Sequence, residues 1–447
     1  MLDLNALFDQ LFPICRSITG EGIRQSMHML QHVMPLQIHA VPSGSKVFDW
    51  EVPPEWQLHR ATLTAPDGTV ILDTAASNLH VLNFSAPFSG ELSLDELQPH
   101  LYSIPELPSA IPYVTSYYQR RWGLCLSHEQ RQALEPGRYK VHIDTEIRPG
   151  ALNYATAFLA GESRETILLT SYLCHPSLAN NELSGPLALV QLYHLLAALP
   201  QRRYSYQFLL IPETIGSITY LATAGQDLAP HLVAGMVLTC LGGPKQRLSL
   251  KMSRRDWIGQ PSVIDQFARH LAMLDSDDFS VRDFTPCSGS DERQFCSPHI
   301  NWPMLQAART VYGDYAGYHN SLDTKAFMSI TQVEESAQRL CQFWQLFELH
   351  DCYVRSTVAG GEPQLGKRGL YPTTNGPMTN QLSRDGSKDG RYVLNLLLQL
   401  LSLADGQFTL LDIAQKLTAP LLDLLPIVLE LQREGLIVLS TEPFGAS

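Results

Sequence analysis

The sequence predicts a multidomain α/β protein whose main domain is built on a largely parallel sheet. The chain has 447 residues, and at about 150 residues per domain this length predicts roughly three domains. Between about 136 and 350, short apolar runs alternate with helical patterns, which is typical of an α/β domain. The chain then ends in three apolar helical patterns and one short apolar run, the outline of a winged helix.

Composition narrows the class of protein before any motif is considered. Hydrophobic residues make up 45% of the chain and charged residues 17%, which favours packed cores over disorder. Thirty-two basic residues face 44 acidic ones, for a formal net charge of -12. A surface of this sign repels polyanions, so nucleic acid is not an expected partner.

Targeting and membrane-spanning segments are not evident in the sequence, so we expect a cytoplasmic protein. No run of about 18 apolar residues is present to span a membrane. The first residues carry Asp3 and Asp9 and lack the basic stretch of a signal peptide. Eight cysteines are scattered without a C-x-x-C pair, so we expect reduced, buried thiols instead of a zinc ribbon or disulfide framework.

The first hundred residues are expected to form two different structures. Residues 2–35 show helical spacing broken at Gly20 and Gly22, which predicts two short helices around a turn. From Val47 onward, short apolar runs are separated by turn residues, and Pro66-Asp67-Gly68 between two alternating runs predicts a hairpin. Residues 45–110 are therefore predicted to be a β-rich domain inserted into a main domain formed by 1–44 and 111–355.

Four apolar runs are the expected strands of the main sheet. They are RYKVHID (138–144), TILLTSYLC (166–174), YQFLLIP (206–212) and AGMVLTCL (234–241). Helical patterns at 186–199 and 263–274 would cover the sheet. Because ligands of α/β sheets bind beyond the carboxyl ends of the strands, the polar sequences that follow these runs are the first place to look for a site.

The end of the chain predicts a linker over 356–390 and a winged helix over 391–447. Helical patterns cover 392–405, 409–417 and 421–435, and the run LIVLS follows. Residues 361–447 hold seven Lys or Arg and nine Asp or Glu. Phosphate contacts need basic side chains, so we expect this domain to serve packing or self-association, including a homo-oligomer, in preference to DNA binding.

The segment CHPSLANNELSGP carries the strongest local grouping. His175 ends a predicted strand and Glu182 precedes a predicted helix. Imidazole and carboxylate on one loop are suitable zinc ligands. The alternative is structural, with a loop histidine bonded to backbone and Glu182 favoured by the helix dipole.

Two further strand ends add candidates. Glu213 leaves an apolar strand between Pro212 and Thr214, where partial burial would raise its pKa toward that of a general base; an N-cap or loop glutamate is the alternative. His319 lies in a loop rich in Gly and Tyr, and Asp323 is spaced to orient its ring. A surface histidine is the alternative there.

Taken together, these motifs resemble the zinc-dependent aminopeptidase superfamily. More narrowly, the chain resembles bacterial aminopeptidase-like proteins associated with polysaccharide biosynthesis, over essentially its whole length. The segments that carry the likeness are FPICRSITGEG, VFDWEVPPEW, SNLHVLNFS, IPYVTSYY, CHPSLANNELSGP, PETIGS, GSDERQFCSP and YHNSLD. The resemblance implies a zinc-exopeptidase sandwich of phosphorylase/hydrolase type with a β-rich insert and a C-terminal winged helix.

The resemblance also implies roles for individual residues. His175 matches the first metal histidine and His319 the last, while Glu213 falls at the place of the general base. Glu182 or Asp291 would complete the metal ligands. Residue type suggests Arg293, Tyr312 and Tyr318 for substrate or oxyanion contacts.

Several positions depart from the superfamily pattern. Asn181 replaces the bridging aspartate, so Asn181 and Asp323 are expected to support the ligands from behind. Ser177 and Thr214 stand where carboxylates are usual, and Gly242-Gly243 where another ligand is common. Two adjacent cations need a bridging anion and several carboxylates, so the sequence favours one zinc ion per chain.

These features predict metal-assisted hydrolysis of an amide bond in a peptide or another small amino-acyl substrate. Two other functions stay open: a catalytically degenerate scaffold, which the missing carboxylates favour, and N-deacylation of an amino sugar. Cysteine catalysis by Cys174 with His175 is disfavoured, because neighbouring residues on a strand point to opposite faces.

Overall fold

The computed structural model describes residues 2–371 and 390–444. These residues divide into two compact units, 1–262 with 282–338 and 263–281 with 339–447. Most of the predicted linker over 356–390 lies outside the described residues. The part that is described contains the short turn η5 (Gly366–Arg368).

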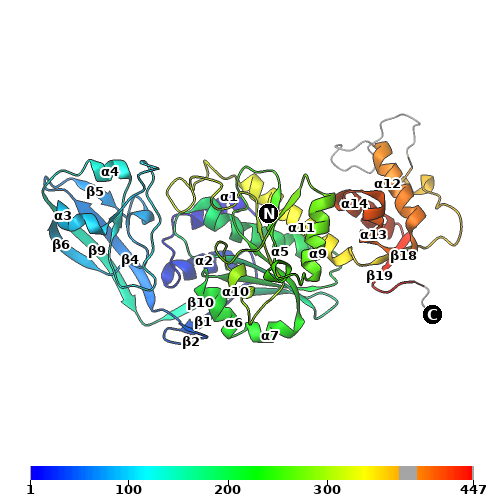
Figure 1. Ribbon diagram of the computed structural model, residues 1–447, viewed down its shortest axis with the longest axis horizontal. Coiled ribbons are helices and arrows are strands. Elements are labelled where there is room, and N and C mark those ends of the chain that lie inside the picture. The colour runs from blue at the N-terminus through cyan, green and yellow to red at the C-terminus, as the bar shows by residue number, and fades with distance from the viewer. Residues whose placement is uncertain (1, 372–389, 445–447) are drawn as a thin grey trace. The chain divides into compact units, whose positions relative to one another are not determined.

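In the described residues the largest sheet has eight strands, of which Figure 1 labels β1 (Gln37–Pro42) and β10 (Ala151–Leu159). Their order is β1 (Gln37–Pro42), β10 (Ala151–Leu159), β12 (Ser205–Ile211), β11 (Thr166–Tyr172), β13 (Leu232–Leu238), β16 (Met304–Ala308), β14 (Leu248–Lys251) and β15 (Phe279–Arg282). The four central strands are parallel to one another, while β1, β10 and β14 pair in antiparallel fashion. Every residue of β11 is buried, as expected for a parallel strand covered on both faces.

A separate four-stranded antiparallel sheet forms the β-rich part of the chain. Its order is β5 (Val70–Asp73), β4 (Glu55–Thr64), β9 (Arg138–Arg148) and β6 (Phe88–Ser93). The predicted hairpin at Pro66-Asp67-Gly68 joins β4 to β5. Two further strand pairs form, one between β2 (Lys46–Val47) and β3 (Trp50–Glu51) and one between β7 (Leu101–Tyr102) and β8 (Leu124–Cys125).

The placement of RYKVHID in the main sheet was wrong, because this segment begins β9. The strand alternates exposed and buried residues, and its buried side chains Tyr139, Val141 and Ile143 pack in the core of the smaller sheet. One wet and one dry face are typical of antiparallel sheets, whereas central parallel strands are apolar throughout. The alternation of Lys, His and Asp with apolar residues therefore indicated a half-exposed antiparallel strand.

Helices form where their patterns predicted them. Helices α1 (Leu4–Leu11) and α2 (Glu21–Gln31) flank the glycine turn. Helix α5 (Ser184–Ala197) follows β11 and corresponds to the helical pattern at 186–199. Helix α9 (Val263–Leu274) corresponds to the pattern at 263–274. The other described α-helices before residue 350 are α3 (Leu94–Leu97), α4 (His128–Gln132), α6 (Ile215–Ala222), α7 (Gly225–Leu228), α8 (Arg254–Trp257), α10 (Glu292–Phe295) and α11 (Ile330–Leu349).

The C-terminal unit contains the expected three helices and terminal strand. They are α12 (Gly390–Leu403), α13 (Leu410–Leu417), α14 (Leu421–Arg433) and β19 (Ile437–Ser440), which pairs with β17 (Tyr353–Ser356) beside β18 (Asp405–Thr409). Within this unit, Asp275 accepts hydrogen bonds from the backbone nitrogens of Leu421 and Leu422 at 2.9 and 3.0 Å and so caps α14.

Among the described residues, no helix combines the length and the apolar character that crossing a membrane requires.

Candidate active site

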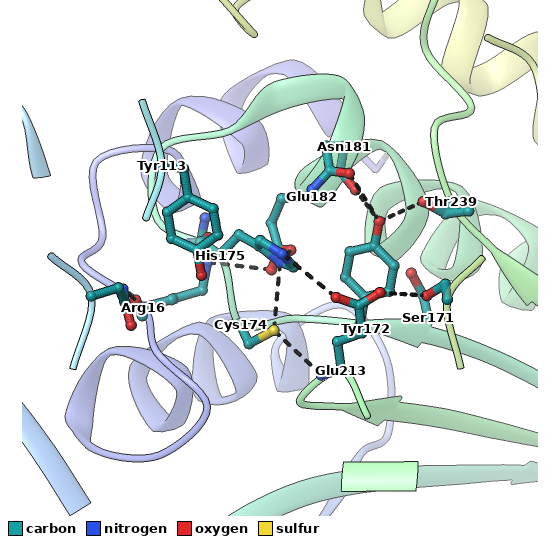
Figure 2. A network of polar contacts seen from close by, with 12 residues as sticks. Arg16, Tyr113, Ser171, Tyr172, Cys174, His175, Asn181, Glu182, Glu213 and Thr239 are labelled. Carbon is teal, nitrogen blue, oxygen red and sulfur yellow. Dashed lines mark hydrogen bonds and ion pairs between the residues drawn. The ribbon is translucent and has the colours of Figure 1, made fainter. Parts of the chain in front are cut away.

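The candidate site lies where β11 and β12 end side by side. These strands are parallel neighbours with Tyr172 opposite Ile211, so the residues that follow them emerge at one edge of the sheet. His175 follows β11 and Glu213 follows β12. Their side chains face each other, with 3.6 Å between Nε2 of His175 and Oε2 of Glu213 (Figure 2).

Glu182 reaches the other nitrogen of the same imidazole. It lies in a π-helical turn, Ala179–Leu183, that precedes α5, and such turns frequently mark functional sites. Its Oε2 is 2.6 Å from Nδ1 of His175, and the Cys174 sulfur is 3.5 Å from that nitrogen. In the described part of the chain, Cys174, His175 and Glu182 form the one group of three donors spaced to hold a metal ion.

The electrostatics of this cluster favour a cation. Burial by itself would lower the pKa of His175, but the Cys174 and Glu182 side chains outweigh it, so the pKa lies well above its ordinary value. Burial raises the pKa of the Cys174 thiol to about 11, which makes this cysteine a poor nucleophile. A proton or a metal ion on His175 is therefore stabilised by the surrounding side chains.

A strained turn holds Glu213. Its neighbour Thr214 has φ 64° and ψ -72°, values that a threonine adopts only under constraint. Asp291 supplies that constraint, because its Oδ1 accepts from the Thr214 nitrogen at 2.7 Å and from the Ser217 hydroxyl at 2.8 Å. Ser290 donates its hydroxyl to Oε1 of Glu213 at 2.9 Å, so Oε2 is left to face His175.

Burial also sets the titration of the two carboxyl groups. It raises the pKa of Glu213, and the positive charge on His175 and the Ser290 hydrogen bond oppose the rise. Burial and the negative charge of Glu213 raise the pKa of Asp291 well above the usual value. Oδ2 of Asp291 has no hydrogen-bond partner among the described residues. The hydrogen bonds that Asp291 makes therefore hold the turn of Glu213. Among the described residues, the group of three donors around His175 does not include Asp291.

His319 closes the site from a third segment. Its ring lies 5.3 Å from that of His175, and its backbone is held at φ 56°. Burial and the charge of His175 lower the pKa of His319 to about 3, so its imidazole is neutral and available as a ligand at neutral pH. Tyr113 packs against both imidazoles, with ring centres at 5.0 and 5.4 Å.

Asn181 belongs to the turn that carries Glu182, and Asp323 binds the backbone of that turn. Asp323 accepts from the backbone nitrogens of Asn180 and Asn181, both at 2.8 Å, and the Tyr172 hydroxyl donates to the Asn181 carbonyl at 2.6 Å. Burial raises the pKa of Asp323 to about 6. Asp323 makes these hydrogen bonds in place of the expected bond to the His319 ring, so its role is to hold the turn that carries Glu182.

Two of the predicted substrate residues, Tyr318 and Tyr312, lie on the side of His319, and the third, Arg293, lies beside Ser290. The Tyr318 ring stacks on His319 at 4.0 Å, and Tyr312 lies 5.8 Å from Tyr318. Arg293, on α10, donates from Nε to the Ser290 carbonyl at 3.3 Å, which places it beside the residue that binds Glu213. Their contact with a substrate stays a prediction.

Two site residues had only weak signals in the sequence. Arg16 lies wholly buried against His175 and Glu182, although an arginine near a chain start usually faces solvent. An arginine within the apolar segment FPICRSI was the available signal. Tyr113 comes from the segment that follows the insert, and its partner His319 is too distant in sequence for any local pattern to show.

The fold and the strand-end cluster define an aminopeptidase-like domain. The zinc aminopeptidase BSAP of Bacillus subtilis has the same fold, with a TM-score of 0.55 and 10% identity over 77% of this chain and 95% of BSAP. The family described as Domain of unknown function (DUF4910) matches residues 5–350, and a winged helix-turn-helix family matches 352–439. The chain belongs to the DUF4910 family and carries a C-terminal winged helix.

A named protein and a crystal structure, both from Clostridium acetobutylicum, match nearly the whole chain. One, named a polysaccharide biosynthesis protein with an aminopeptidase-like domain, is 38% identical over 410 residues, which are 92% of this chain and 90% of the relative. The other is a crystal structure described as that of a peptidase, with 35% identity and a TM-score of 0.82, covering 98% of this chain and 96% of that one. The predicted aminopeptidase-like α/β fold and C-terminal winged helix are thereby confirmed, while the predicted domain bounds stay a prediction.

Proposed function

We propose that this protein is a metal-dependent hydrolase that cleaves an amide bond, in a peptide or another amino-acyl substrate. One observation carries the proposal: a buried histidine and a constrained glutamate face each other across 3.6 Å at the ends of two parallel strands. A neutral second histidine lies beside them. The aminopeptidase-like fold supports this assignment.

The residues present suit a zinc ion. Imidazole and carboxylate are its usual ligands, and Oε1 of buried Glu182 has no hydrogen-bond partner among the described residues. His175 and His319 would hold the ion, with Glu182 as the nearest carboxylate to His175. One ion per chain is proposed, because Asn181 and Thr214 supply no charge for a second. Bound zinc would polarise the scissile carbonyl and make water more acidic.

Glu213 is the proposed general base. Its raised pKa brings it closer to working pH, where proton transfer is most efficient. The hydrogen bond from Ser290 fixes Oε1, so Oε2 is the atom that would take a proton from the attacking water and return it to the leaving amine. Arg293, Tyr312 and Tyr318 would contact the substrate or its developing negative charge.

N-deacylation of an amino sugar is the second candidate. It breaks the same type of bond, and the relative named for polysaccharide biosynthesis favours it. A binding scaffold that has lost activity is the third, favoured by Ser177, Asn181 and Thr214 at positions where carboxylates are usual. All three share the fold, so substrate profiling separates them.

The winged helix is proposed to contact protein, including a second copy of this chain. Its α14 carries Asp423 and Glu430 against Arg433, a balance that does not favour phosphate binding. The proposed setting is the cytoplasm, in keeping with cysteines that carry free thiols in the described residues.

The test joins metal analysis to hydrolysis. The purified protein should hold about one zinc per chain and release amine from an amino-acyl amide or an N-acetylated amino sugar. Glu213→Gln should lower kcat by about 10²- to 10⁴-fold while zinc content and circular dichroism stay unchanged. Zinc-free protein with no turnover on either substrate class, even after zinc addition, would establish the scaffold instead.

A further inference from the structure

Arg16 is a buried guanidinium at the candidate site that the proposed mechanism does not use. It follows α1, and its side chain is 0% exposed. Nη1 donates to the Leu11 carbonyl at 2.6 Å and lies 3.4 Å from the Ser26 hydroxyl, while Nε donates to the His175 carbonyl at 3.0 Å. Burying such a group is costly unless charge and hydrogen bonds compensate it.

The compensating charge is Glu182. Its Oε1 lies 3.8 Å from Nε of Arg16, and both side chains are 0% exposed. Its Oε2 is the atom that bonds Nδ1 of His175 at 2.6 Å. Guanidinium, carboxylate and imidazole thus form one buried row, and Figure 2 shows Arg16, Glu182 and His175 gathered together.

The row determines which nitrogen of His175 faces the reaction. A separation of 2.6 Å is a hydrogen bond, shorter than the distance between two ligands that each lie about 2 Å from one zinc ion. With Nδ1 bonded to Glu182, Nε2 is the nitrogen that faces Glu213. A carboxylate behind a metal-binding histidine fixes its tautomer and its ring orientation.

We propose that Arg16 is a positioning residue of the metal site, which acts through Glu182 to hold the His175 ring with Nε2 toward the substrate. This inference rests on the proposed function. It gives the N-terminal segment a role at the site and assigns Glu182 to orienting His175 in place of binding the metal, so that His175 and His319 are the zinc ligands that remain.

Contacts outside the row fix Arg16 independently of Glu182. Asn83, from the segment before β6, donates to the Arg16 carbonyl at 2.9 Å, and the Ser17 hydroxyl donates to Asn83 at 2.6 Å. Both ends of the residue are therefore anchored. An anchored guanidinium can orient a carboxylate because it does not itself have to be ordered when the metal binds.

The test is a double-mutant cycle read by zinc affinity, measured by competition with a chelating dye. Arg16→Met and Glu182→Gln should each weaken zinc binding by about 10- to 100-fold. Because one residue acts through the other, the double variant should bind zinc within about threefold of Glu182→Gln alone. Arg16→Lys keeps the charge and should recover part of the affinity.

Arg309→Met is the matched control. Arg309 is also a buried arginine, paired with Glu335 at 2.9 Å, so its loss should lower stability and leave zinc affinity unchanged. If Arg16→Met does not fold, Glu182→Gln and Arg16→Lys still decide the matter.

Three results would count against the proposals. Full zinc affinity in both Arg16→Met and Glu182→Gln would overturn the positioning role while leaving the hydrolase proposal intact. Complete loss of zinc in Glu182→Gln would make Glu182 a ligand and also overturn it. Absence of zinc binding in the unmodified protein would instead refute the proposed function.

Discussion

The candidate site and the winged helix differ in how far their backbone and polar groups depart from local preference. At the site, Ser177, Thr214 and His319 have positive φ, and Oε1 of Glu182 and Oδ2 of Asp291 lack hydrogen-bond partners within the described residues. In the winged helix, α13 begins with a complete capping box, and Thr418 is the one non-glycine residue with positive φ in its described part.

This difference separates a region shaped for chemistry from a region shaped for stability. Strain and unmet polar groups persist only when surrounding contacts impose them, and they gather where a protein binds or reacts. The start of α13, with its capping box and apolar face, by contrast agrees with local preference. Substitutions in each region test this difference through their effects on activity and on stability.

The largest expected effect is at Lys251. Its Nζ pairs with Oε1 of Glu292 at 2.8 Å with both side chains buried, and Glu292 also accepts from the Ser290 nitrogen. Lys251→Met leaves that carboxylate unpaired, so the free energy of unfolding should fall by about 3–5 kcal/mol in urea denaturation. The double change with Glu292→Leu should recover stability but not activity, because the Ser290 segment loses its anchor. A loss under about 1 kcal/mol for Lys251→Met would contradict this account.

A smaller effect is expected where Asp275 caps α14. Asp275→Ala should destabilise the C-terminal unit by about 0.5–2 kcal/mol, the usual cost of a lost N-cap, measured by thermal unfolding of the full chain. Burial raises the pKa of Asp275 to about 6, above the unfolded value of about 3.9. The folded state therefore holds the proton more tightly. Stability from protonation is complete below about pH 4 and is lost as pH rises through about 6.

Asp275→Asn provides the control for that pH dependence. It keeps an acceptor at the end of α14 but does not titrate, so the change in melting temperature between pH 4 and pH 6 should diminish. An unchanged pH profile in Asp275→Asn would assign the dependence to other groups.

The smallest effect compares two threonines with positive φ, Thr214 at the site and Thr418 at the end of α13. Thr418→Gly should stabilise the protein by up to about 1 kcal/mol, because the left-handed conformation costs a side-chain-bearing residue about 1–2 kcal/mol and glycine gives back part of that gain in entropy. Thr214→Gly relieves similar strain but loosens Glu213, so kcat should fall while stability holds. Equal activity in the two variants would show that the Thr214 strain has no functional role.

The sequence carried the parts of the fold that depend on local pattern. The apolar runs of β11 and β12 end in His175 and Glu213, and the parallel pairing of such runs brings their ends together. The capping box of α13 and the apolar faces of the winged helix are local as well, whereas the cap of α14 comes from the distant Asp275. RYKVHID was misplaced because its apolar residues were given more weight than their alternation with polar ones.

Residues whose role depends on distant partners were not predictable in the same way. Nothing near Arg16 in the sequence indicates that its charge is met by Glu182, far along the chain. The role of Asp291 as support for Thr214 likewise follows from a contact between separate segments. The resemblance named Asp291 only as a metal ligand, and the partners of both residues are a property of the fold.

Contacts between the segment of Ile111 and Tyr113, which lies between β7 and β8, and the loop of His319 bear on the order in which the site can form during synthesis. The Tyr113 nitrogen donates to the His319 carbonyl at 2.8 Å, and the Ile111 nitrogen donates to the Ser321 hydroxyl across a separation of 210 positions. The antiparallel sheet of β4, β5, β6 and β9 is complete in the chain by Arg148, so it can fold on the ribosome well before His319 is made. The site therefore stays incomplete through most of the synthesis of the chain, until the segment that carries His319 has been made.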